Sequence, residues 1–249
     1  MDLGLDGRVA VVTGASRGLG KAAVEALVAE GASVLAAARS TADLEKLQAT
    51  DPEHIAIATV DMRDADAVAA LADLAVDRFG RLDVVVNNAG IAPAGKFSAQ
   101  PQAEWEEVFA VNVHAPAVLA RAAGKHFLAQ RSGKVINVAS TSGINGKPIL
   151  VSYSASKGAL VQFTKALGAE WAPFGIQVNA IAPGAFTTDA QAAVTGDPSM
   201  LERRLRKIPA GRMADPAEFG PLVCYLASPL SDFVNGSVLV IDGGEVTKL

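Results

Sequence analysis

Two side chains that can cooperate in proton transfer, Tyr153 and Lys157, lie four residues apart in this 249-residue chain. On a helix this spacing puts both on one face. A phenol has a pKa of about 10, and a neighbouring ammonium lowers that pKa by favouring the phenolate. Tyr153 is therefore predicted to be a general acid or base. Ser140, at the end of a predicted strand, is suited to hydrogen-bond a substrate carbonyl oxygen. Taken alone, the Tyr-x-x-x-Lys spacing fits a half-exposed helix face better than a catalytic pair.

A glycine-rich turn near the N-terminus is predicted to position a phosphorylated ligand. The β-branched run 9–13 predicts a buried strand, and a helix begins just after Gly14, Gly18 and Gly20. The N-terminus of a helix has free N–H groups and a positive dipole end, and small residues let a diphosphate approach the backbone. The spacing is T-G-x-x-x-G-x-G rather than G-x-G-x-x-G. A glycine-rich turn without a ligand is the alternative interpretation.

The same turn also fits the G-x-S-x-G pattern of the α/β-hydrolase nucleophile elbow, with Ser16 as the nucleophile. Such an enzyme normally places its elbow after a later strand and its catalytic histidine near the C-terminus. The last histidine of this chain is His126, so the pattern does not favour a hydrolase.

The residues that follow the second predicted strand indicate which dinucleotide binds. NAD enzymes usually have an acidic residue there for the ribose diol, whereas this chain has Ala38 and Arg39. Arg39 and Arg17 can hold a 2′-phosphate through paired N–H donors. NADP(H) is therefore predicted, with NAD(H) as the alternative; two solvated surface arginines would be the simplest other explanation.

The composition excludes several classes of protein. The chain is 50% hydrophobic and 19% charged, with a net charge of −4, so no basic surface for nucleic acid is expected. Cys224 is the only cysteine, which excludes an intrachain disulfide and a cysteine-rich metal site. No apolar run approaches the roughly 18 residues of a membrane span. The expectation is a cytoplasmic protein of one domain, 1–249, without a membrane, nucleic-acid or metal partner.

Strand and helix patterns alternate along the chain, which predicts an α/β fold: a doubly wound parallel sheet of about seven strands with helices on both faces. Beyond the first glycine turn, helices are predicted at 44–49, 64–79, 104–130 with an interruption at Pro116, 154–171 and 216–227. Strands are predicted at 9–13, 34–38, 55–60, 82–86, 135–138, 176–181 and 238–241. In the helix 64–79, the residues predicted to face inward are Val68, Leu71, Leu74 and Ala75. The irregular stretch 183–214 is predicted to be a flap over the ligand site.

Taken together, the motifs resemble those of the short-chain dehydrogenase/reductase family, in the same order and across nearly the whole chain. The matching residues are Thr13-Gly14-x-x-x-Gly18-x-Gly20, Asp61, Asn87-Asn88-Ala89-Gly90, Asn112, Ser140, Tyr153-x-x-x-Lys157, Pro183-Gly184 with Thr188, and Asp242-Gly243-Gly244.

The resemblance implies a Rossmann-type fold and reversible hydride transfer between a nicotinamide and a carbonyl or secondary alcohol. It implies that Tyr153 carries the proton, that Lys157 assists it and binds the ribose, that Ser140 orients the carbonyl, and that Asn112 helps to hold a relay water. The implied cofactor-binding residues are Gly14, Ser16, Arg17, Gly18, Leu19, Gly20, Arg39, Asp61, Met62, Asn88, Ala89, Gly90, Tyr153, Lys157, Pro183, Gly184, Phe186 and Thr188.

The substrate stays open between two subfamilies. The resemblance extends to 3-oxoacyl carrier-protein reductases and to sugar-acid or polyol dehydrogenases such as gluconate 5-dehydrogenase. Phe174 stands where many carrier-protein reductases have a basic residue, whereas the stretches 173–175, 207–210 and 231–236 look more like the sugar-acid group. A regulator that binds NADP without turnover is an alternative of another class, although it would not need Ser140, Tyr153 and Lys157. The resemblance also implies a homotetramer, with a dimer as the alternative.

Overall fold

A single sheet of seven parallel strands forms the centre of the molecule in the computed structural model, which describes residues 2–248. The strand order is β3-β2-β1-β4-β5-β6-β7. All neighbouring strands are parallel. The strands are β1 (Val9–Thr13), β2 (Ser33–Ala38), β3 (Ile55–Thr59), β4 (Val84–Asn87), β5 (Gly133–Val138), β6 (Ile176–Pro183) and β7 (Val238–Ile241). The predicted sheet is confirmed.

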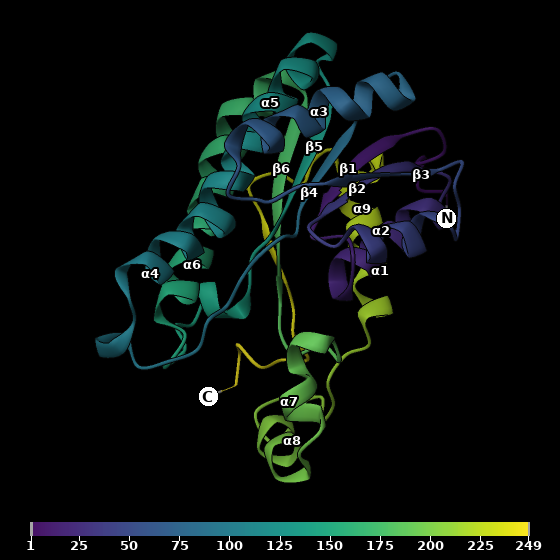
Figure 1. Ribbon diagram of the computed structural model, residues 1–249. Coiled ribbons are helices and arrows are strands. Elements are labelled where there is room, and N and C mark those ends of the chain that lie inside the picture. Colours follow the sequence, from purple (N-terminus) through teal and green to yellow (C-terminus); the bar gives the residue numbers. More distant parts are fainter. Residues whose placement is uncertain (1, 249) are drawn as a thin grey trace.

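Helices cover both faces of the sheet (Figure 1). On one face lie α1 (Gly18–Ala29), α2 (Thr41–Gln48) and α9 (Gly220–Ala227); on the other lie α3 (Ala65–Phe79), α5 (Ala115–Gln130) and α6 (Val151–Trp171). The short α4 (Gln102–Phe109) precedes α5. Among residues 2–248, no helix combines the length and the apolar character that crossing a membrane requires.

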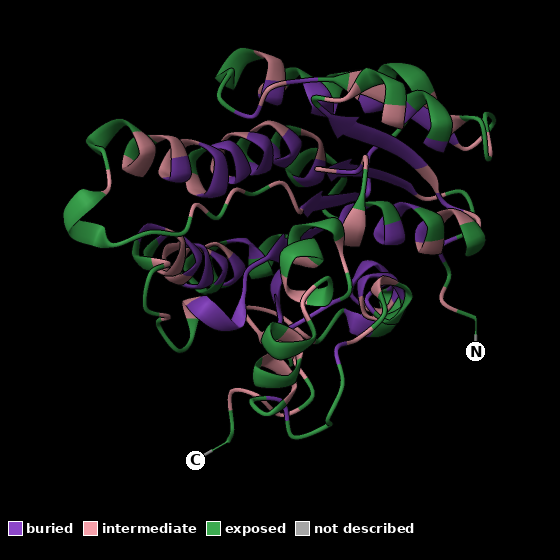
Figure 2. Ribbon diagram, turned by 60° about the horizontal axis from the view of Figure 1, so that its bottom comes forward, coloured by how far each residue is buried: buried purple, intermediate pink, exposed green. Residues whose placement is uncertain are grey.

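Two hydrophobic cores, one on each side of the sheet, hold these layers together. Leu27 and Phe219 belong to the core beneath α1 and α9, and Leu71 and Phe127 to the core beneath α3 and α5. The central strands are buried on both faces (Figure 2), which explains why their sequences are continuously apolar rather than alternating. Most of the fold's stability therefore comes from this two-sided burial, which also fixes the ends of the strands in space.

The carboxyl ends of β1 and β4 form the point at which the chain reverses its direction of sheet growth. After β1 the chain builds outward through β2 and β3, and then returns to add β4 on the other side of β1. The crossovers leave a crevice at such a point, where open α/β sheets bind their ligands.

The segment after β6 lies beyond the carboxyl ends of the strands (Figure 1). It contains two short helices, α7 (Ala192–Thr195) and α8 (Pro198–Leu205). Asp197 caps α8 by accepting hydrogen bonds from the backbone N–H groups of Ser199 (2.8 Å) and Met200 (3.2 Å). The predicted flap is thus a structured element at the mouth of the crevice.

Two predicted helices have different boundaries in the structure. The helix predicted at 104–130 consists of α4 and α5 joined by a π-helical turn, Ala110–His114, so the interruption comes before Pro116 rather than at it. Pro116 is the second residue of α5, just after this turn, a position at which a π-helical turn accommodates the missing N–H of a proline. The helix predicted at 154–171 begins at Val151, which places Tyr153 inside its first turn.

Two further expectations are wrong in detail. Leu74 was predicted to face inward, but its side chain is 46% exposed because the buried stripe of α3 follows Val68, Leu71 and Ala75. The helix predicted at 216–227 is split into a 3₁₀ turn, Pro216–Glu218, and α9. The turn is closed by a capping box between Asp215 and Glu218.

Candidate active site

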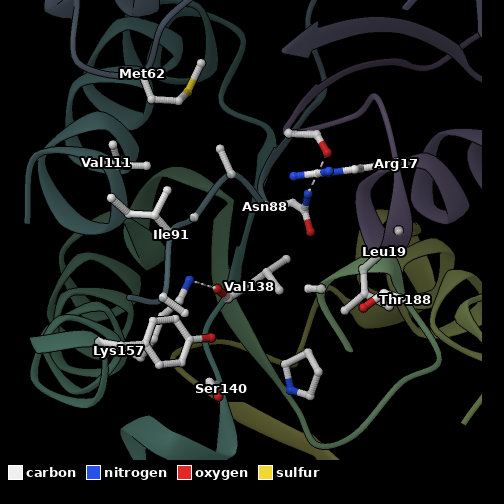
Figure 3. A pocket seen from close by; sticks show the side chains of 18 of the residues that line it. Arg17, Leu19, Met62, Asn88, Ile91, Val111, Val138, Ser140, Lys157 and Thr188 are labelled. Carbon is white, nitrogen blue, oxygen red and sulfur yellow. Dashed lines mark hydrogen bonds between the residues drawn. The ribbon is translucent and has the colours of Figure 1, made fainter. Parts of the chain in front are cut away.

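A cavity of about 1090 Å³ runs along the carboxyl ends of the central strands (Figure 3). Its walls are the turn after β1, the ends of β2, β4, β5 and β6, the start of α6 and part of the segment after β6. This volume is at the upper end of the range for small-molecule sites. The predicted site residues that line it are Gly14, Ser16, Arg17, Gly18, Leu19, Arg39, Asp61, Met62, Asn88, Ala89, Gly90, Ser140, Tyr153, Lys157, Pro183, Gly184 and Thr188.

The turn between β1 and α1 has the backbone that a diphosphate requires. Gly14 has a φ of +64°, and a Cβ on it would lie 2.9 Å from the Cα of Ala89. Gly18, the first residue of α1, has a φ of +54°. No side chain caps α1, and its first turn contains no acidic residue. The free N–H groups of α1 and its positive dipole end therefore face the cavity, which fits a bound anion.

Thr13 and Asn88 join this turn to the loop after β4. Asn88 Nδ2 donates to the carbonyl oxygens of Thr13 (2.9 Å) and Gly14 (3.1 Å). In return, the backbone N–H groups of Asn88 and Ala89 donate to Thr13 Oγ1 at 3.0 and 3.1 Å. Asn88 thus fixes the shape of the glycine turn, in addition to lining the cavity (Figure 3).

The end of the cavity beside β2 carries two arginines that are available to a ligand. Within residues 2–248, neither the Arg17 nor the Arg39 guanidinium forms an ion pair or a side-chain hydrogen bond. The neighbouring carboxylate of Asp61 is held by Arg63, whose Nη2 lies 2.5 Å from Asp61 Oδ2 and whose hydrogen bonds lower the pKa of Asp61 to about 2. Because Arg63 neutralises Asp61, the positive charge of Arg39 is left over for a phosphate.

The other end of the cavity brings Ser140, Tyr153 and Lys157 together. Ser140 follows β5, and its Oγ accepts a hydrogen bond from the N–H of Ser142 at 3.0 Å, which opens a 3₁₀ turn. Lys157 is 3% exposed, and its Nζ donates to the carbonyl oxygen of Val138 at 2.7 Å (Figure 3). The same Nζ lies 5.8 Å from the centroid of the Tyr153 ring. The structure thus brings these three predicted side chains to one cavity, at the end of β5 and the start of α6.

The pKa of Tyr153 is not lowered by Lys157 in the structure, contrary to the expectation from their spacing. Burial raises the pKa of the Tyr153 phenol above 10.0, and a hydrogen bond with Ser140 acts in the opposite direction. The ammonium points to Val138 rather than to the phenol oxygen, so burial is the larger effect on Tyr153. The predicted lowering of the Tyr153 pKa by Lys157 is therefore wrong. Burial also lowers the pKa of Lys157 itself, to about 8.

Asn112 lies outside the cavity, in the π-helical turn before α5. Its Nδ2 donates to the carbonyl oxygen of Ile91 (2.9 Å) and to Ser156 Oγ (3.0 Å), and its Oδ1 accepts from the N–H of Ile91 at 2.9 Å. Both side-chain donors are thus used in tying the Ile91 loop to α6. A Cβ on Gly90 would lie 3.3 Å from Asn112 Oδ1 and 3.4 Å from Lys157 Nζ. The Asn112 and Lys157 side chains therefore both lie beside Gly90, which lines the cavity. The relay water expected there stays a prediction.

Two other predicted residues contribute to packing instead of to the cavity wall. A Cβ on Gly20 would lie 2.2 Å from the carbonyl oxygen of Gly14, so a hydrogen at this position permits the close packing of the turn on α1. Phe186 is 3% exposed and packs edge to face against Phe219, with ring centroids 6.2 Å apart. The structure places both beneath the site rather than in it.

The sequence analysis missed several polar residues that build the site. Asn137 on β5 accepts from Asn87 Nδ2 and donates to Thr164 Oγ1 on α6, both at 2.9 Å. A buried asparagine in an otherwise apolar strand is a signal that could have been noticed, since it must find partners. Lys147 and Arg204 also line the cavity.

Comparisons with known proteins agree with this geometry. The family model described as enoyl-(acyl carrier protein) reductase matches residues 14–245. The chain is 36% identical to the 2-dehydro-3-deoxy-D-gluconate 5-dehydrogenase of Bacillus subtilis over 247 residues, covering 98% of this chain and 96% of the relative. It is 33% identical to the 3-oxoacyl-[acyl-carrier-protein] reductase FabG of Vibrio cholerae, covering 97% of this chain and 98% of the relative.

A solved structure extends the comparison to three dimensions. The gluconate 5-dehydrogenase of Burkholderia cenocepacia, in complex with NADP and tartrate, superposes with a TM-score of 0.93 at 33% identity, covering 98% of this chain and 97% of that one. This chain belongs to the short-chain dehydrogenase/reductase family of NAD(P)-dependent oxidoreductases that act on CH–OH groups.

The low pKa of Lys157 predicts that this residue costs folding stability. The pKa of Lys157 is about 8 in the folded protein, against 10.5 for an unperturbed lysine. Between these two pH values, the unfolded chain therefore binds a proton that the folded chain has released. Stability should then rise with pH over that window. Below pH 8, Lys157→Met should be more stable than the unaltered protein by at most about 3 kcal/mol, and the difference should shrink towards pH 10.5. Urea unfolding of both proteins across this range measures it. A difference that stays constant with pH would contradict the burial of a charged amine here.

Proposed function

We propose that this chain catalyses reversible oxidation and reduction between NADP(H) and a secondary alcohol or its carbonyl form, at the end of the cavity formed by Ser140, Tyr153 and Lys157. The observation that carries the proposal is one continuous cavity that joins these residues to the glycine turn of β1 and α1. When bound there, the nicotinamide supplies or accepts the hydride. The presence of Ser140, Tyr153 and Lys157 favours an enzyme over a regulator that only binds the cofactor, because a regulator would not need these residues.

Tyr153 is the proton donor and acceptor in this proposal. A carbonyl oxygen gains negative charge when its carbon is reduced, so an acid must be in place before that happens. The raised pKa of Tyr153 keeps its phenol protonated at neutral pH, which suits donation in the direction of carbonyl reduction. Ser140 supplies a second hydrogen bond to the same oxygen. Lys157, whose Nζ lies 5.8 Å from the centroid of the Tyr153 ring, is proposed to support Tyr153 and to bind the nicotinamide ribose.

The residues present also fit NADP(H). The glycine turn and the N-terminus of α1 would hold the diphosphate, while Asp61 and Met62 would border the adenine. The guanidinium groups of Arg17 and Arg39 would hold the 2′-phosphate, because each has donors that the protein leaves unused. NAD(H) lacks that phosphate and would leave both arginines unpaired.

The segment 183–214 is proposed to act as the flap over the nicotinamide. Pro183, Gly184 and Thr188 line the cavity, and the two short helices α7 and α8 follow. Its position beyond the strand ends (Figure 1) would exclude water from the reacting groups when it closes.

A small hydroxylated substrate is the best supported class. Relatives of this chain are named for gluconate derivatives, whereas another is named for an acyl carrier protein substrate. A panel of sugar acids, polyols and 3-oxoacyl thioesters, followed through NADPH absorbance, tests the proposal. Turnover of at least one ketone or alcohol is expected. If no compound of the panel is turned over, the proposal is contradicted.

We also propose a cytoplasmic location, where an NADP(H)-dependent reductase finds its cofactor.

A homotetramer is proposed for the assembly, with a dimer as the alternative. Large apolar side chains stay exposed in two regions: around α4, where Phe97 is 58% exposed beside Trp105, and before β7, where Phe233 is fully exposed. Exposed apolar clusters of this kind favour association. Light scattering at micromolar concentration should give the mass of four chains. The mass of one chain would contradict the proposal.

A further inference from the structure

Three charged side chains from distant parts of the chain meet at the substrate end of the cavity. Lys147 comes from the loop between β5 and α6, Arg204 from α8, and Glu245 from the segment after β7. Lys147 and Arg204 line the cavity. In Figure 1 the C-terminal segment runs close to α7. The ion pair between Glu245 and Arg204 joins this segment to α8.

The contacts within this cluster are unequal. Arg204 binds Glu245 in a bidentate pair, with Nη1 2.5 Å from Oε1 and Nη2 2.7 Å from Oε2. Lys147 makes only long contacts, 3.4 Å to Glu245 Oε1 and 3.3 Å to Thr141 Oγ1. An ammonium has three donors, so Lys147 has the capacity to bind a further acceptor. Burial lowers the pKa of Lys147, and the charges of Arg204 and Lys207 act in the same direction as burial, against Glu245. One carboxylate thus serves two partly buried cations, which leaves a positive charge at the cavity wall.

This positive charge lies next to the reacting groups. Thr141, which Lys147 contacts, is the residue after Ser140. Of the arginines proposed for the 2′-phosphate, Arg17 directly precedes α1 and Arg39 follows β2. Strand β2 is three strands away from β5, which is roughly 14 Å at the usual strand spacing. The cluster is therefore separate from the cofactor's phosphates and close to the position of the substrate.

A carboxylate from α4, that of Glu104, also lines the cavity and is suited to hydroxyl groups. Glu104 on α4 accepts a hydrogen bond from Gln100 Nε2 at 2.8 Å, and the same nitrogen donates to Ser152 Oγ, beside Tyr153. The remaining acceptors of Glu104 can bind hydroxyl donors, while an anion would be repelled. The cavity wall thus carries both a cationic cluster and a carboxylate that can accept hydrogen bonds from hydroxyl groups.

We propose that Lys147 and Arg204 bind the carboxylate of a hydroxylated monocarboxylate substrate, and that Glu245 holds Arg204 in place and limits the affinity. This inference rests on the proposed function, since it assigns the substrate class of the same site. The substrate would be the anion of a sugar acid, oriented with its carboxylate on Lys147 and Arg204 and a carbon further along the chain at Ser140 and Tyr153. A neutral polyol of the same length would lack the anchoring group.

The test compares matched acids and alcohols for binding to the NADP-loaded protein by titration calorimetry. The probes are D-gluconate against D-glucitol, and D-glycerate against glycerol. We expect at least one acid to bind more tightly than its neutral partner. Arg204→Gln should weaken acid binding about 10- to 100-fold, the range for hydrogen bonds to charged groups, and affect the neutral partner much less. Arg206→Gln is the matched control. It removes the same charge from the residue that follows α8. Among residues 2–248, the Arg206 guanidinium pairs only with the exposed Glu202, and it lies outside the cavity.

The Glu245→Gln variant distinguishes between two interpretations of the cluster, an anion-binding site and an ion pair with a structural role only. This variant breaks the same pair with Arg204, but it frees the guanidinium and removes a negative charge. The proposal predicts tighter acid binding in Glu245→Gln and weaker binding in Arg204→Gln. If both variants weaken acid binding equally, or acids and alcohols lose affinity alike, the cluster only fixes α8 and the proposal is overturned. It is also overturned if no acid binds better than its neutral partner. Loss of NADPH-dependent turnover with every ketone would instead count against the proposed function.

Discussion

Replacing Tyr153 with phenylalanine should reduce kcat about 10²- to 10⁴-fold, the usual contribution of general acid–base catalysis. The ring and its packing at the start of α6 are kept, and only the hydroxyl is lost. Because the glycine turn and the two arginines that would hold NADPH are untouched, the dissociation constant for NADPH should change little. Steady-state kinetics beside a fluorescence titration with NADPH separates the two effects.

The matched variant for this experiment is Lys157→Ala, which should damage both quantities. Lys157 is proposed to support Tyr153 and to contact the nicotinamide ribose, so kcat should fall and NADPH binding should weaken. If Tyr153→Phe keeps most of its activity, Tyr153 is not the proton donor. If Lys157→Ala lowers kcat alone, its proposed contact with the cofactor is wrong.

The second large effect concerns the choice of cofactor. Ala38→Asp combined with Arg39→Ser should weaken NADPH binding about 10- to 100-fold, because a charge-assisted pair is lost and a repelling carboxylate is added. The same change should strengthen NADH binding, since an aspartate at the end of β2 can accept hydrogen bonds from the ribose diol. Ala38 lines the cavity, and its backbone oxygen stays paired with the N–H of Val60. The ratio of the two dissociation constants should therefore reverse.

Arg206→Gln provides the control for this reversal. Arg206 carries the same charge, but it lies outside the cavity and its guanidinium pairs with the exposed Glu202. This variant should leave the NADPH-to-NADH ratio nearly unchanged. A preference of the unaltered protein for NADH would contradict the assignment of Arg17 and Arg39.

Much of the fold could be predicted because local sequence determines it. Continuous apolar runs mark strands buried on both faces, and the glycine spacing marks the turn after β1. The common location of Tyr153 and Lys157 follows from a helical spacing of four residues. Helix boundaries were harder to predict where tertiary packing decides them, as in the π-helical turn before α5. The exposure of Leu74 was also harder to predict, because it depends on how α3 packs on its neighbours.

The electrostatics and the charged cluster could not be predicted in the same way. The pKa of Tyr153 depends on how deeply α6 is buried, which the spacing of two residues does not reveal. Lys147 and Glu245 are 98 positions apart, and Arg204 and Glu245 are 41 apart. Only the return of the chain past β7 to α8 brings them together. Residues of this kind have no local signature, since their function depends on contacts between distant segments.

The most direct test of hydride transfer uses NADPH deuterated at the transferable position of its nicotinamide. The unaltered protein is incubated with this cofactor and a panel of keto sugar acids and neutral ketoses, and the products are analysed by mass spectrometry. The prediction is an alcohol product that carries one deuterium on the carbon of the former carbonyl, formed by the unaltered protein and far more slowly by Tyr153→Phe. An alcohol product without deuterium, or no product from any of these compounds, would contradict direct hydride transfer at this site.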